Sequence, residues 1–219
     1  MFYDPHYILP KHLNTYINGI KRSRALAQLA DSATITSESV STDIANSSVV
    51  TAVGSLDFLC KKILRESVLS YLYGFLEPPG RIRLEIPLTV ARLAVDAANN
   101  STRDLGVGTD HIMAATALDK SLLRRNFQGI PAIKDLFKSL GFENPQKIIP
   151  HDIYTNFEKN IKRLTEDRHE IVHTTAINLE FYDFGGEGSV SRSIVTDEMA
   201  ESLVLGGECL IQYVESRLT

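Results

Sequence analysis

The segment RHEIVH, residues 168–173, brings a guanidinium, two imidazoles and a carboxylate into less than two helical turns. Counted from His169 it has the pattern His-Glu-x-x-His, which places two imidazoles on one helix face to bind zinc, with Glu170 between them. Counted from Arg168 it is a cation followed, about one and a half turns later, by the titratable base His173. The segment therefore fits two different chemistries.

The zinc interpretation requires a third protein ligand. The extended form of the motif would place Gly and His where this chain has Ala176 and Leu179. The residues just before His169 are charged, whereas a zinc helix of this kind usually lies in an uncharged core. Acidic residues that remain candidate ligands are Glu180, Glu187, Glu198 and Glu201. A third interpretation is that His169 and His173 are a solvated pair near a helix end, where a cation complements the dipole.

The elements that position this segment are predicted to be helices. Apolar residues recur at helical spacing over residues 10–30, 39–74, 88–99, 109–125 and 131–140, and again from residue 150 to beyond the motif. Residues 174–195 are strand-like around Gly-Gly-Glu-Gly, which predicts a small hairpin near 176–195. Thr196 is the expected N-cap of a final helix over residues 196–218, and Gly141 the expected C-terminal cap of helix 131–140.

The helix over residues 39–74 is predicted to be amphipathic, with a broad apolar stripe and charged residues on its other faces. The charged residues expected to point away from the stripe are Asp57, Lys61, Lys62, Arg65 and Glu66. These patterns together predict an all-α helical bundle with short non-helical insertions.

Bulk composition indicates one globular domain over residues 1–219. The chain has 219 residues, 43% of them hydrophobic, and a net charge of −4, which does not favour a general nucleic-acid coat protein. Its two cysteines, Cys60 and Cys209, lie among apolar residues and are expected to be reduced core thiols of a cytoplasmic protein. Neither a signal peptide nor a membrane-spanning segment is expected.

Three segments, taken in order, resemble the HEPN superfamily, most closely its RiboL-PSP and MAE-type branches. They are SSVVTAVGSLDFLCKKILRESVLSYL, with Ser55, Leu56, Asp57 and Phe58 at its centre; IKDLFKSLGFENPQKI; and IKRLTEDRHEIVHT followed by the final helix. The resemblance covers roughly residues 40–219. We therefore divide the domain into an N-terminal helix, 1–36, which matches weakly, and a core, 37–219.

The resemblance implies a HEPN-type bundle that acts as a homodimeric, metal-independent endoribonuclease without a cofactor, as a toxin or phage-defence component. Arg168 and His173 match the family's Arg-x4-His signature. His169 stands where Asn is more usual, and is expected to position substrate or carry a second proton. Lys159, Lys162 and Arg163 are expected either to steer RNA or to form an ordinary solvated face, and Asp57 and Glu170 to support the site.

The implied partners are RNA, a second copy of the chain, and an antitoxin or other defence-system protein. Relatives that pair with a nucleotidyltransferase antitoxin have Tyr two residues after the motif His, where this chain has Thr175. The alternatives are an inactive HEPN-like module that binds RNA or protein, and a zinc hydrolase using His169, Glu170 and His173.

Overall fold

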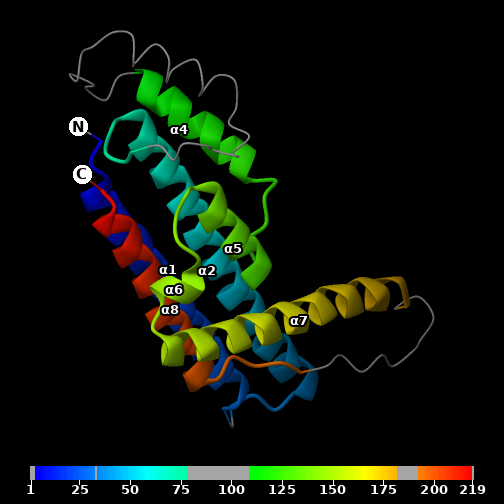
Figure 1. The fold of residues 1–219 in the computed structure, drawn as a ribbon. Coiled ribbons are helices and arrows are strands. Elements are labelled where there is room, and N and C mark those ends of the chain that lie inside the picture. The colour runs from blue at the N-terminus through cyan, green and yellow to red at the C-terminus, as the bar shows by residue number, and fades with distance from the viewer. Residues whose placement is uncertain (1–2, 33, 78–108, 182–191, 219) are drawn as a thin grey trace.

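A computed structural model of the protein describes residues 3–32, 34–77, 109–181 and 192–218 (Figure 1). Seven α-helices and no strand occur in these residues, which confirms the all-α prediction. Their buried apolar side chains form one continuous cluster. None of the helices in the described ranges has the length and apolar character needed to cross a membrane.

Three long helices form the body of the molecule: α1 (Pro5–Ala30), α2 (Glu38–Leu72) and α8 (Asp197–Ser216). Figure 1 shows α1 and α8 side by side, with the two chain ends at the same end of the bundle. Gly207 of α8 lies against the ring of Tyr16, so close that an added Cβ would be 2.4 Å from Tyr16 Cε1. Small residues on α8 therefore set the spacing of its packing.

The connecting helices α4 (Thr109–Leu122) and α5 (Ile130–Ser139) pack against α2, and the short helix α6 (Pro145–Ile148) packs against α7 and α8 and leads into α7. Helix α5 ends as predicted, because Gly141 adopts φ of +68°, a left-handed conformation that costs glycine little. Thr196 is also confirmed as an N-cap, since its side chain accepts a hydrogen bond from the backbone N–H of Met199 in α8.

Helix α7 (His151–Phe181) crosses the end of the bundle and runs out past it (Figure 1). Its first half buries Phe157, Ile161 and Leu164 in the core. Gly206 of α8 makes this packing close, since an added Cβ there would be 2.2 Å from Phe157 Cδ2. The core thus anchors one half of α7 and leaves the other half to project.

The predicted hairpin near 176–195 is wrong where the structure describes it. Helix α7 continues to Phe181, and residues 192–195 form no strand. Extending an existing helix requires no new nucleus, so the β-branched and aromatic residues after the motif are accommodated despite their modest helix propensity. Residues 182–191, including the Gly-Gly-Glu-Gly segment, and the helix expected at 88–99 lie outside the described residues.

Candidate functional site on helix α7

The RHEIVH segment lies on α7 at the point where the helix leaves the core. Ile171 is 8% exposed and still packs inward, whereas its neighbour Val172 is 46% exposed. His169, Glu170 and His173 are exposed and Arg168 is half-buried. The sequence prediction that the motif sits on a helix is confirmed, and its chemical groups are open to a ligand.

The two imidazoles form a pair. The ring centroids of His169 and His173 are 4.1 Å apart, with 61° between the ring planes, as expected for residues four apart on one helix face. Arg168 is about 140° around the helix from His173 and ~7.5 Å along its axis, so a ligand must span an arc to reach both. Within the described part of the chain, Arg168 makes no ion pair.

Lys159, Lys162 and Arg163, which precede the motif on α7, differ in whether an acid lies near them. Lys162 Nζ lies 4.0 Å from Glu166 and Arg163 Nε lies 3.9 Å from Asp167, both across one helical turn. The Lys162–Glu166 pair is exposed at both ends, and such pairs are weak and open readily to a competing anion. Lys159 is exposed and, among the described residues, has no acidic partner. Among the three predicted RNA-steering residues, Lys159 is therefore the one that no described acid pairs with.

The fold shifts the pKa of Asp167, the acid directly before the motif. Burial raises the pKa of this carboxyl above its ordinary value, and the nearby charges of Glu170 and Glu166 add to the rise. Arg163 and a hydrogen bond from Ser193 act in the opposite direction without cancelling it. The fold therefore makes this carboxyl beside Arg168 easier to protonate than an ordinary aspartic acid.

The same histidines are also the two candidate zinc ligands of the motif. Among the described residues, no three His, Cys, Asp or Glu side chains come together in a way that could hold a metal ion. The predicted candidates Glu198 and Glu201 thus do not join the histidines in such a group. The side chains of Glu180 and Glu187 lie outside the described set. Within this chain, a third ligand for the zinc interpretation would have to be a side chain that the structure does not describe.

The sequence analysis expected Asp57 to support the motif site. In the structure, its bonds go to other residues and not to the motif histidines. Its Oδ1 accepts a hydrogen bond of 2.8 Å from the backbone N–H of Phe127, and its Oδ2 pairs with Lys61 at 2.7 Å. Phe127 belongs to the link between α4 and α5. Asp57 therefore supports the motif helix only indirectly, by holding this link, which in turn contacts α7 at Thr165.

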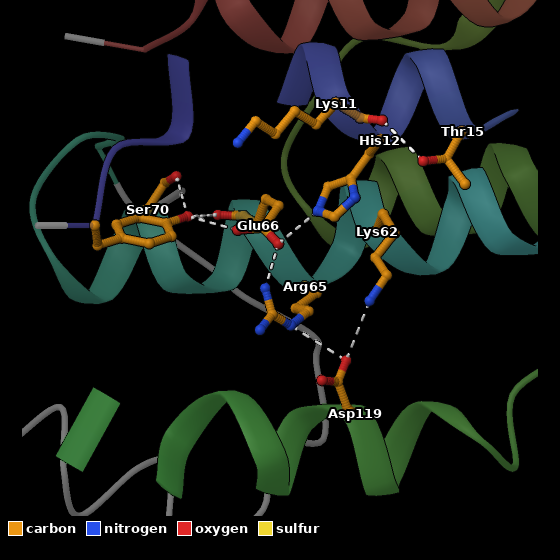
Figure 2. Close-up of polar contacts among 9 residues, drawn as sticks. Lys11, His12, Thr15, Lys62, Arg65, Glu66, Ser70 and Asp119 are labelled. Carbon is orange, nitrogen blue, oxygen red and sulfur yellow. Dashed lines mark hydrogen bonds and ion pairs between the residues drawn. The ribbon is translucent and has the colours of Figure 1, made fainter. Parts of the chain in front are cut away.

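A second polar cluster, which sequence reasoning missed, lies between α1, α2 and α4 (Figure 2). Glu66 was predicted to face away from the apolar stripe of α2, but its side chain is fully buried. It lies 3.1 Å from His12 Nε2, accepts a hydrogen bond of 3.0 Å from the Tyr3 hydroxyl, and pairs with Arg65 Nη1. Figure 2 also shows Arg65 reaching Asp119 of α4, 3.2 Å from its Nε.

Burial alone would raise the pKa of Glu66, but the hydrogen bond with His12 and the charge of Arg65 outweigh it, so the pKa lies below its ordinary value. The carboxylate is thus held charged inside the protein. Because Glu66 is enclosed, a polymeric substrate cannot reach it, and we interpret the cluster as structural. The sequence signal for this burial is the position of Glu66, three residues after Ile63 and three before Leu69, which is the helical spacing of the apolar stripe.

Comparison with known proteins yielded no relative: no family model, curated protein or solved structure matches this chain significantly.

Proposed function

We propose that this protein is a metal-independent endoribonuclease that cleaves RNA with Arg168 and His173 of α7, as a homodimer in which two motif helices form one cleft. The observation that carries the proposal is the grouping, on the projecting half of α7, of two exposed imidazoles 4.1 Å apart and an arginine without an ion pair among the described residues. The HEPN resemblance of the motif supports it.

The chemistry needs three functions. A base removes the proton of the 2′-hydroxyl, whose oxygen attacks the adjacent phosphorus; an acid protonates the departing 5′-oxygen as the P–O5′ bond breaks; and a cation stabilises the charge that develops on the phosphate. The products are a 2′,3′-cyclic phosphate and a 5′-hydroxyl. Histidine can accept or donate a proton near neutral pH, and arginine presents a planar fork to phosphate oxygens.

In this assignment His173 is the general base or acid and Arg168 binds the scissile phosphate. His169, whose ring adjoins that of His173, is the second proton carrier or positions the first. A second copy of the helix supplies the opposite arc of the cleft, which one helix cannot provide because Arg168 and His173 lie about 140° apart. Exposed Val172 offers an apolar contact for that second copy.

Cleavage of a mixed RNA pool with EDTA present tests the proposal. The wild-type protein is expected to produce cyclic-phosphate ends, and Arg168→Ala and His173→Ala to lower the rate by about 10²–10⁴-fold. Glu170→Gln is the matched control: it changes a neighbouring exposed residue that only the zinc mechanism needs as a base. Full activity of the Arg168 and His173 variants would contradict the assignment.

The zinc alternative makes a different prediction for the same proteins, namely activity that EDTA abolishes and that Glu170→Gln destroys. An inactive binding module predicts RNA binding without any cleavage. The proposal extends to the setting that the resemblance implies, a cytoplasmic toxin or phage-defence component with an antitoxin or another defence protein as partner. Growth arrest on expression of the wild type, but not of His173→Ala, is the outcome expected there.

A further inference from the structure

The link between α4 and α5, residues 123–129, is held against the motif helix at a defined point. Asp57 of α2 accepts a hydrogen bond of 2.8 Å from Phe127 N–H, and Thr165 of α7 donates its hydroxyl to the carbonyl oxygen of Gln128. Thr165 lies one helical turn before Arg168 and His169. Figure 1 shows the link descending from the end of α4 to the start of α5 beside α7.

The link carries an accessible cation. Arg124 is exposed and makes no ion pair with any described residue. Arg124 and Arg168 are thus two guanidiniums, on the link and on the helix it contacts, that make no ion pair with a described residue, unlike Lys162 and Arg163 of α7. Two such cations on neighbouring segments favour a polyanion that passes over both, because each phosphate bound displaces counterions.

A groove of about 370 Å³ lies between the link and one face of α5. Its lining combines apolar surface with hydrogen-bonding groups: Phe127, Ala132 and Leu136, together with Asn126, Asp135 and Ser139. The volume falls in the range of small-ligand sites, and an apolar lining with a few polar groups is what an unstacked nucleobase requires. The amide of Asn126 can both donate to and accept from a base edge.

We propose that the α4–α5 link and this groove form a second contact site for single-stranded RNA, in which Arg124 binds a backbone phosphate and the groove holds one unstacked base of the same strand. The inference rests on the proposed function, because it places the RNA that enters the α7 site. It names single-stranded RNA as the substrate class, since a base in a duplex is stacked and cannot enter a groove.

Equilibrium binding of a mixed-sequence RNA oligonucleotide with every 2′-hydroxyl methylated measures the contact without cleavage. Arg124→Ala is expected to weaken binding about three- to tenfold and to reduce the slope of log K against log salt by roughly 0.7, the value for one phosphate on a single strand. Ala132→Leu, which fills the groove, is expected to weaken binding without changing the slope. Arg22→Ala removes an exposed cation from α1, and is expected to change neither.

The outcomes separate this inference from the proposed function. If the wild type cleaves RNA but both Arg124→Ala and Ala132→Leu bind as Arg22→Ala does, the second contact site is overturned and the nuclease assignment stands. If the wild type neither binds the methylated pool nor cleaves the unmodified one, both are overturned. Equal weakening by Arg124→Ala and Arg22→Ala would indicate general charge attraction and also overturn the site.

Discussion

Replacing Glu66 with alanine tests the interpretation that a buried carboxylate joins α1 to α2. The change removes the carboxylate that accepts from Tyr3 and pairs with His12, and it takes away the charge that faces Arg65. The Tyr3 hydroxyl keeps the backbone carbonyl oxygen of residue 66 as an acceptor. Arg65 stays where it is, with a side chain only 17% exposed. Leaving the Arg65 charge mostly buried without Glu66 destabilises the folded state far more than losing an ion pair at the surface does.

The size of the destabilisation depends on how far Asp119, the acid that remains beside Arg65, compensates for the loss of Glu66. Removing one member of a buried ion pair costs about 3–5 kcal/mol. Asp119 still lies 3.2 Å from Arg65 Nε but is 47% exposed, so it compensates only in part. We therefore expect the lower end, about 3 kcal/mol, which for a chain of this length corresponds to a fall in Tm of roughly 6–12 °C.

Urea unfolding followed by far-ultraviolet circular dichroism measures this loss, with Asp119→Ala as the matched control. That variant also removes a carboxylate partner of Arg65, but an exposed one, and is expected to cost only about 0–1 kcal/mol. Equal destabilisation by the two variants would refute the argument, because it would mean that burial of Glu66 does not set the strength of the interaction.

Three further predictions concern stability. The pKa of Glu66 is lower in the folded than in the unfolded protein, so its contribution is present above about pH 4.5 and is lost as pH falls below that value; unfolding curves of Glu66→Gln should show a weaker acid dependence than those of the wild type. Gly206→Ala should destabilise the fold by about 1–3 kcal/mol, because the added Cβ would meet Phe157. Gly54→Ala, which has open space around it in α2, should stabilise it by about 0.5–1 kcal/mol. Thermal unfolding of both variants tests whether close packing at Gly206 sets the distance between α8 and α7. Thr196→Ala should destabilise the fold by about 1 kcal/mol, because it removes the N-cap hydrogen bond of α8. Ser37→Ala, at an N-cap whose side chain makes no such bond, should destabilise it less. Equal free energies of unfolding for the two variants in urea would argue against a stabilising cap at Thr196.

Local patterns in the sequence determined the helical class and most helix positions. Apolar spacing located α2, α5 and α8, and the chemistry of single residues located two helix ends, at Thr196 and Gly141. The same spacing showed that Arg168, His169 and His173 share a helix. These features depend on residues within a few turns of one another, so a single sequence is enough to reveal them.

Partnerships between distant residues were decided only by the tertiary structure. His12 meets Glu66 across 54 residues, and Asp57 meets Phe127 across 70, and helical spacing carries no information about either pair. The motif could be found in the sequence, but its position on the half of α7 that leaves the core could not, because it depends on where α2 and α8 stop covering the helix. The contact of Thr165 with the α4–α5 link arises in the same way, from packing between segments that are remote along the chain.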